Sequence, residues 1–379
     1  MAFLWWVLLL SVAWNGEERM MVMGLNGKCE FPAIFNFGDS NSDTGAISAS
    51  FFEVPPPNGE TFFRKPSGRV CDGRLMIDFI AENLGLPYLT AYLDSLGEGF
   101  RHGANFATGG STIRPQNVTL FEGGVSPFSL DIQILQFDQF KSRSNALYVK
   151  ENALKANVPK PEDFCKALYT FDIGQNDLVA GFRTMSDDGV RASIPKILVG
   201  LSQVIQLLYG QGARSFWIHN TGPIGCLPLS VIYYPLKPRN IDKYGCVYTQ
   251  NDVAQEFNRQ LKVMVSQLRK QLPLAALTYV DVYSAKFNLI THAKEQGFGD
   301  PMKFCCGHAG DYTVGCGRKA VVNGTEIYGS SCGNPSMYVS WDGVHYSHAA
   351  NQWIANHILN GQLSEPPLPL PQACKRVDP

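Results

Sequence analysis

The sequence predicts an α/β layer fold with a largely parallel central sheet. Short apolar runs that end in turn residues alternate with longer stretches of helical periodicity, and this alternation is typical of parallel strands joined by helices. A chain of 379 residues would allow two domains. Because neither a linker-like break nor an internal repeat interrupts the pattern, one domain over residues 28–362 is expected.

The first strand is predicted at residues 33–37, an apolar run that ends where Gly38 and Asp39 introduce a turn. A second buried strand is predicted at residues 164–173, which a Gly-Gln-Asn-Asp turn follows. The next element is a helix at residues 194–208, which we expect to close at the glycines of positions 210 and 212.

A third strand is predicted at residues 215–219, and a helix at residues 252–272 follows it. This helix gives the clearest signal, because its apolar residues recur every three or four positions and fall on one stripe. They are Val253, Phe257, Leu261, Met264, Leu268 and Leu272. Pro273 ends the helix, and residues 277–282 are predicted to form the next strand.

The last part of the chain contains a glycine- and cysteine-rich segment, residues 297–335, which is interpreted as a loop region held by disulfides. A final helix is predicted at residues 349–359, with Ser347 as its cap and Gly361 near its end. Residues 363–379 are interpreted as a proline-rich tail.

Residues 1–27 are interpreted as a secretory signal peptide. The apolar block at residues 3–13 is too short to span a bilayer, and polar residues follow it. A membrane anchor is the alternative for this block. Further along, no stretch has about 18 uninterrupted apolar residues, so a second membrane segment is not expected.

Cysteine content and two short motifs also favour export. Ten cysteines in an exported chain favour disulfides, although their spacing does not reveal which cysteines pair. Asn117 and Asn323 each begin an Asn-x-Thr acceptor pattern for N-glycosylation. The chain is therefore predicted to be a secreted glycoprotein. Its net charge of −1 and lack of a basic run exclude the usual electrostatics of nucleic-acid binders.

A serine at the end of the first strand is the leading candidate for a nucleophile. Ser40 lies in the run FGDSNSDTG at residues 37–45, where a parallel sheet presents loop residues to ligand. A serine hydroxyl needs a base, and the segment WDGVH at residues 341–345 supplies His345 with Asp342 three positions before it. One turn holds both residues, so the carboxylate can orient the imidazole.

Two further segments offer donors for the oxyanion that forms when an ester is attacked. The glycine-rich turn at residues 103–111 contains Gly109 and Gly110, whose N–H groups can approach an anion closely. Asn176 follows the second strand, and its side-chain NH₂ can donate without adding charge. Each segment alone is more typical of a turn; together with Ser40 and His345 they indicate acyl transfer.

These four segments resemble the GDSL esterase/lipases, also called SGNH hydrolases, in their secreted plant branch. The resemblance extends from residue 31 to about residue 359, and the segments GETFF at 59–63, SGR at 67–69 and DGR at 72–74 are similar to early-nodulin-like members. It implies a three-layer α/β/α fold, no metal or organic cofactor, and a location in the cell wall, apoplast or vacuole. The family's usual leucine after the serine is Asn41 here.

The resemblance also implies a role for each site residue. Ser40 would be the nucleophile, His345 the base and Asp342 its orienter. The N–H of Ser40, Gly110 and the Asn176 side chain would form the oxyanion hole, with Gly109 as a neighbour that competes for the glycine's place. The implied activity is hydrolysis of carboxylic esters. Two alternatives stay open: an acyltransferase that uses the same residues, and a catalytically silent carbohydrate-binding or defence protein.

Several other motifs are rejected. Ser331 lies in a G-x-S-x-G pattern, but a cysteine-rich loop precedes it and Pro335 follows, so the strand and helix of a nucleophile elbow are missing. Residues 39–50 imitate a calcium loop without its glycine and closing glutamate. The cysteines near His308 lack zinc-finger spacing. His348 competes with His345 as base, but it is expected to be a surface residue of the last helix.

Overall fold

The computed structural model describes residues 27–96, 99–150, 153–233, 240–310 and 312–376. The expected signal peptide at residues 1–27 lies outside this part of the chain except for its last residue.

A six-stranded sheet forms the middle layer, with the strand order β11-β5-β4-β3-β1-β2. Five strands run parallel: β1 (Ile34–Gly38), β2 (Gly103–Asn105), β3 (Leu168–Asp172), β4 (Ser215–His219) and β5 (Ala276–Val280). They are buried almost throughout, as parallel strands covered on both faces must be. The predicted α/β class with a mostly parallel sheet is confirmed.

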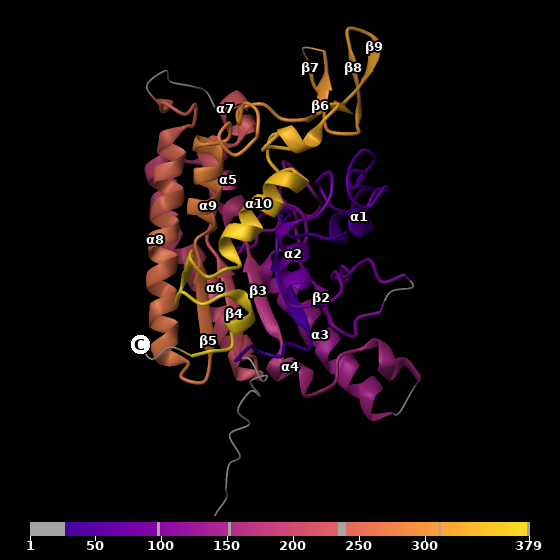
Figure 1. Cartoon of the computed structure of the whole chain (residues 1–379), viewed down its shortest axis with the longest axis vertical. Coiled ribbons are helices and arrows are strands. Elements are labelled where there is room, and N and C mark those ends of the chain that lie inside the picture. The colour runs from indigo at the N-terminus through magenta and orange to yellow at the C-terminus, as the bar shows by residue number, and fades with distance from the viewer. Residues whose placement is uncertain (1–26, 97–98, 151–152, 234–239, 311, 377–379) are drawn as a thin grey trace, which may run out of the picture.

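Helices cover both faces of the sheet (Figure 1). On one face α10 packs against α2 and α9, and on the other α6 packs against α3, α5 and α8. Their bounds are α2 (Met76–Asn83), α9 (Val282–Thr291) and α10 (His348–Ile358), then α3 (Leu130–Val149), α5 (Gln175–Thr184), α6 (Asp187–Gly210) and α8 (Tyr248–Gln271). Shorter helices are α1 (Ala46–Ser50), α4 (Asp163–Lys166) and α7 (Pro228–Tyr233). The arrangement is the expected three-layer one.

The clearest predicted helix is confirmed. The apolar stripe of α8, from Val253 to Leu268, is buried, and the capping serine of α10 accepts the N–H of Ala350 at 3.1 Å. By contrast, α6 begins seven residues before the predicted start at residue 194. Ser186 caps it by accepting the Gly189 N–H, and Pro195 therefore lies inside the helix rather than at its first turn.

The predicted strand at residues 164–173 is wrong in its first part. Residues 163–166 form the single-turn helix α4, and the strand begins only at Leu168. Asp163 explains the difference, because its carboxylate accepts the N–H of Lys160 and pairs with Arg101. These bonds hold the chain in a turn before the N–H of Leu168 joins the sheet by donating to Ala33.

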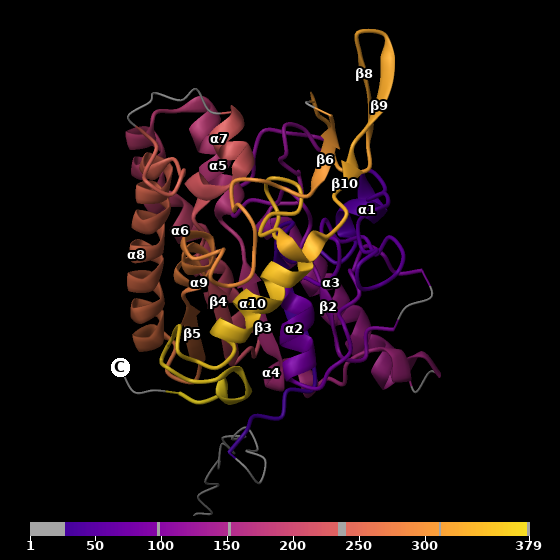
Figure 2. The same cartoon turned by 45° about the horizontal axis from the view of Figure 1, so that its top comes forward.

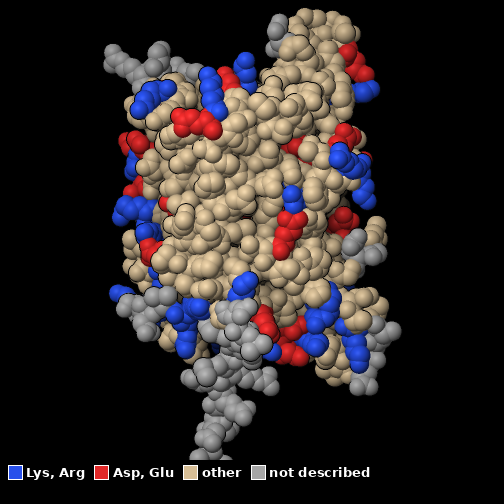
Figure 3. All heavy atoms as spheres, in the orientation of Figure 1, with Lys and Arg blue, Asp and Glu red and all other residues tan. Residues whose placement is uncertain are grey.

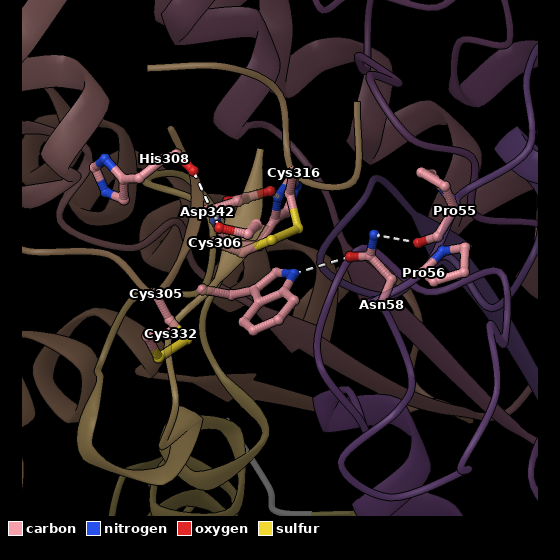
Figure 4. Close-up of a disulfide and its surroundings, with 12 residues drawn as sticks. Pro55, Pro56, Asn58, Cys305, Cys306, His308, Cys316, Cys332 and Asp342 are labelled. Atoms are coloured by element: carbon pink, nitrogen blue, oxygen red, sulfur yellow. Dashed lines mark hydrogen bonds and ion pairs between the residues drawn. A yellow bond between two sulfur atoms is a disulfide. The ribbon is translucent and has the colours of Figure 1, made fainter. Parts of the chain in front are cut away.

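The cysteine-rich segment forms a small cap at the carboxyl edge of the sheet (Figure 2). It contains a three-stranded antiparallel sheet of β6 (Cys306–Ala309), β7 (Tyr312–Thr313) and β10 (Ser330–Ser331), and the projecting hairpin β8 (Lys319–Val322) and β9 (Thr325–Tyr328). Disulfides Cys305–Cys332 and Cys306–Cys316 cross-link it (Figure 4). The expected stapled loop region is thus confirmed.

Two more disulfides, Cys29–Cys374 and Cys226–Cys246, bring the paired cysteines to eight, and Cys71 and Cys165 are free. Residues 363–379 were expected to be a tail, but the described part of this segment, residues 363–376, is built into the domain. Its strand β11 (Ser364–Glu365) pairs antiparallel with β5 at the edge of the sheet, and the Cys374 disulfide fixes the chain beyond it. A two-residue strand that Pro366 follows directly gives no recognisable sequence pattern.

Candidate active site

Three neighbouring strands bring the front half of the candidate site together. Ser40 follows β1, Gly110 lies in the turn after β2, and Asn176 lies in the first turn of α5 after β3. Since β1 pairs in parallel with both β2 and β3, the carboxyl ends of all three meet at one edge. The placement that the sequence predicts for these residues is therefore present in the fold.

Backbone bonds fix the loop that carries Ser40. Gly38 must be a glycine, because a Cβ there would lie 2.6 Å from the carbonyl oxygen of Asp172. The next residue, Asp39, donates its N–H to that same oxygen at 3.1 Å. Ser40 itself is half-buried, and its N–H donates no hydrogen bond within the described part of the chain. This N–H is free to bind an oxyanion.

Asp43 ties the serine loop to the glycine turn. Its buried carboxylate accepts three N–H groups from residues 45–47, and its Oδ2 accepts the N–H of Gly109 at 2.7 Å. The N–H of Gly110, by contrast, has no acceptor among the described residues. Gly110 also has φ +77°, a left-handed conformation that favours glycine. Of the two candidate glycines, Gly110 is therefore the one whose N–H is available to a ligand.

Asn176 is oriented by a partner on the glycine turn. Its Nδ2 donates to the carbonyl oxygen of Ser111 at 2.9 Å, which uses one of two N–H groups and leaves the other available. The neighbouring Asp177 accepts the N–H groups of Ile113 and Arg114. Burial raises the pKa of Asp177 to about 7, against the lowering effect of these two bonds.

Asp342 and His345 form a hydrogen-bonded pair. Nδ1 of His345 lies 2.7 Å from Oδ2 of Asp342, and Oδ1 accepts the backbone N–H groups of Val344 and His345. Burial disfavours the imidazolium, but the Asp342 carboxylate outweighs this and raises the pKa of His345 above its usual value. Nε2 of His345 is buried and has no hydrogen-bond partner in the described chain. The pair is thus arranged as a base with a free accepting nitrogen.

The cap braces this pair from the side. The N–H groups of Cys305 and Cys306 donate to the carbonyl oxygens of Ser340 and Trp341, at 3.2 Å and 2.6 Å. Trp341 is fully buried and its indole donates to Asn58. Figure 4 shows Asp342 beside the Cys306–Cys316 disulfide. The stapled loops therefore support the backbone from which Asp342 and His345 project.

A buried charge cluster beneath the serine loop escaped the sequence analysis. Asp39 and Asp172 are its carboxylates, and Lys286 of α9, 2% exposed, is its cation. Nζ of Lys286 lies 4.7 Å from the centre of the Tyr346 ring, and its Cδ leaves no room for a side chain at Gly222. In the sequence, the one lysine within the largely apolar segment 282–290 could have indicated this buried cluster.

The cluster influences the candidate base. Burial and the neighbouring Asp172 raise the pKa of Asp39 to about 7. Burial lowers the pKa of Lys286, while Asp172 and Asp39 oppose that change. Asp39 favours the protonated form of His345 and Lys286 disfavours it. Asp39 and Lys286 thus act in opposite directions on the pKa of His345.

The rejected motifs lie elsewhere. Ser331 is exposed on β10 and is followed by a 3₁₀ turn rather than a helix, and the four cysteines near His308 are joined in disulfides. His348, expected at the surface, is half-buried. Its ring stacks on Phe62, and its Nδ1 accepts the N–H of Arg74 at 2.9 Å, because α10 packs against α2.

Both glycosylation acceptors are exposed. Asn323 lies at the tip of the β8–β9 hairpin with φ +50°, a turn conformation that asparagine tolerates. On the face in Figure 3, side chains of both signs are interspersed, mainly around the rim. Within the described residues, α6 alone is long and apolar enough to cross a membrane, and here it packs against α5 and α8.

The chain is similar in sequence to several known proteins. The family model for GDSL-like lipases/acylhydrolases matches residues 34–358. A GDSL esterase/lipase of Arabidopsis thaliana is 58% identical over 352 residues, which cover 92% of this chain and 90% of the relative. The GDSL esterase/lipase ENOD8 of Medicago truncatula is 47% identical over 353 residues, 92% of this chain and 91% of that one. Alpha-L-fucosidase 3 of Arabidopsis thaliana is 52% identical over 355 residues, 92% and 93% of the two chains.

Proposed function

Because the chain belongs to the plant GDSL esterase/lipase family and is thereby a carboxylic ester hydrolase, we propose that Ser40, His345 and Asp342 perform this hydrolysis. The assignment rests on the hydrogen bonding of the two ring nitrogens of His345. Its Nδ1 is held by Asp342 at 2.7 Å, while its buried Nε2 has no partner in the described chain. A general base needs this combination of a fixed ring and an open accepting nitrogen.

The first half of the reaction forms an acyl-enzyme. Nε2 of His345 takes the proton of the Ser40 hydroxyl as Oγ attacks the ester carbonyl carbon. The resulting oxyanion accepts the N–H groups of Ser40 and Gly110 and the second N–H of Asn176, none of which has another acceptor in the described chain. The imidazolium, stabilised by Asp342, then gives its proton to the leaving alcohol oxygen.

The second half repeats these steps with water. His345 takes a proton from water, the hydroxide oxygen attacks the acyl carbon, and the same donors hold the second oxyanion. Collapse breaks the bond to Ser40 Oγ, which regains its proton from His345, and the carboxylic acid leaves. A sugar or organic-acid hydroxyl in place of water would give the acyltransferase reaction with the same residues.

Replacement of the nucleophile tests the assignment. Ser40→Ala should reduce hydrolysis of p-nitrophenyl butyrate to the uncatalysed background, while its melting temperature stays close to that of the unchanged protein. Ser331→Ala is the matched control, since this exposed serine lies in the competing motif, and it should keep full activity. Full turnover by Ser40→Ala would overturn the proposal.

We also propose that the protein is secreted and glycosylated. Four disulfides, two exposed acceptor asparagines and the apolar block at residues 3–13 support this location. Protein recovered from plant apoplastic fluid should lack the apolar block and should lose mass on treatment with an N-glycosidase. An intact N-terminus and an unchanged mass would contradict the proposal.

A further inference from the structure

We propose that four phenylalanines bind the acyl group of the ester and select apolar acyl groups larger than acetyl. They are Phe51, Phe52, Phe121 and Phe128, called here the phenylalanine wall. The inference rests on the proposed roles of Ser40, Gly110 and His345, because these residues define the two sides of the bound ester.

The wall is a continuous aromatic surface beside the glycine turn. The ring of Phe121 lies 6.1 Å from that of Phe51 and 5.2 Å from that of Phe52, and Phe51 lies 5.3 Å from Phe128. All four side chains are half-buried rather than enclosed in the core. They come from the end of α1 and from the segment between the glycine turn and α3. Two separate segments therefore converge to expose phenyl surface.

Contact with Gly110 places the wall at the oxyanion hole. A Cβ built on Gly110 would lie 2.8 Å from Cε2 of Phe121, so the ring edge touches the α-carbon of this residue. The N–H of Gly110 is the proposed donor to the carbonyl oxygen of the substrate. A substituent on the substrate's carbonyl carbon that extends toward Gly110 will therefore contact Phe121 after only a few bonds.

The position of His345 decides which part of the ester faces the wall. The general acid must reach the leaving oxygen, so the alcohol lies on the His345 side. His345 lines a small hollow together with Leu227 and Pro228, which follow β4, and Ile290 of α9, which follows β5. Gly110 follows β2, at the opposite end of the order β5-β4-β3-β1-β2. The acyl substituent consequently points away from β4 and toward the wall.

The chemistry of the wall favours an apolar acyl group. Phenyl faces and edges offer dispersion contacts and little hydrogen bonding, and each methylene that leaves water is worth about a fourfold gain in affinity. The guanidinium of Arg318 lies 4.7 Å from the centre of the Phe52 ring and donates to the carbonyl oxygen of Glu53. The guanidinium therefore lies at one end of the wall, and these two contacts engage it. An acetyl group is too short to use this surface.

A chain-length series tests the inference. We would measure kcat/KM for p-nitrophenyl acetate, butyrate, octanoate and benzoate with the unchanged protein and with Phe121→Ala, Phe121→Leu and Phe51→Ala. The unchanged protein should hydrolyse octanoate or benzoate at least tenfold more efficiently than acetate. Phe121→Ala should lose about tenfold on the larger esters and less than threefold on acetate, and Phe121→Leu should recover octanoate hydrolysis. The comparison of octanoate with benzoate shows whether the preferred acyl group is aliphatic or aromatic.

The matched control is Phe100→Ala. Phe100 is also half-buried and packs in an aromatic cluster, against Tyr92 and Phe140, but it precedes β2 at the opposite edge of the sheet. The Phe100→Ala variant should leave kcat/KM for all four esters unchanged. A preference for acetate in the unchanged protein, or an equal loss on all four esters in Phe121→Ala, would overturn the inference. If the ester series contradicts the inference while Ser40→Ala has no activity, the proposed function still holds and only the role of the phenylalanine wall is wrong. If Ser40→Ala keeps its activity, the proposed function itself is wrong.

Discussion

Asp342 binds His345 twice, through the ring Nδ1 at 2.7 Å and through the backbone N–H at 2.8 Å. One carboxylate thus fixes both the imidazole and the turn that carries it. Because the two residues are three positions apart, this arrangement needs no contribution from a distant strand, which explains why a short sequence segment could predict it.

Asp342→Asn should lower kcat by about three to four orders of magnitude, because the base loses its orienter and the charge that stabilises the imidazolium. Asp342 raises the pKa of His345, and only neutral His345 acts as a base, so kcat/KM of the unchanged protein rises as pH increases through that raised pKa. In the variant the pKa falls, and the acid limb of the residual activity should move to lower pH. A pH profile from 4 to 9 measures both effects; an unmoved limb would contradict the assignment.

Lys286→Met should shift the acid limb of the kcat/KM profile in the opposite direction, to higher pH. The buried ammonium disfavours protonation of His345, so its removal should raise the pKa of His345 and shift the acid limb of kcat/KM to higher pH. Loss of packing alone would lower activity without moving the limb. Lys294→Met, at an exposed position just beyond α9, is the control and should keep the profile of the unchanged protein.

Asn176→Ala should reduce kcat by about 10²–10³ with a small change in KM, because the lost donor serves the oxyanion rather than the ground-state ester. Gln175→Ala is the matched control, since it removes the neighbouring amide in the same helical turn and should have full activity. Steady-state kinetics on p-nitrophenyl butyrate measure both variants. Equal losses in the two would indicate a folding defect of α5 instead of an oxyanion donor.

Asp43→Asn should lower the free energy of unfolding by about 2–4 kcal/mol, because an amide cannot satisfy four buried N–H donors as a carboxylate does. The loss should be accompanied by reduced kcat, since Asp43 links the serine loop to Gly109. Urea unfolding measures the stability change. The exposed Asp188→Asn should change it by less than about 0.5 kcal/mol; a similar loss there would show that Asp43 has no special role.

Local patterns predicted the strands and the loops that carry Ser40, Asn176 and His345, because each residue lies directly after an apolar run or before a capped helix. Non-local pairing was not predictable in the same way. The partner of Cys306 is set by the fold of the cap. The ring that stacks on His348 and the residues around Lys286 are set by how α2, α9 and α10 pack. The phenylalanine wall joins segments about 70 residues apart, and β11 has only two residues.

The Cys29–Cys374 bond closes the domain at its two ends. Cys29 precedes β1, so these ends lie at the amino edge of the sheet, opposite the serine loop (Figure 1). A fusion protein or a surface tether joined at the C-terminal end would consequently leave the substrate entrance unobstructed. The enzyme is therefore suited to immobilisation in one orientation, with every attached molecule presenting the same open face.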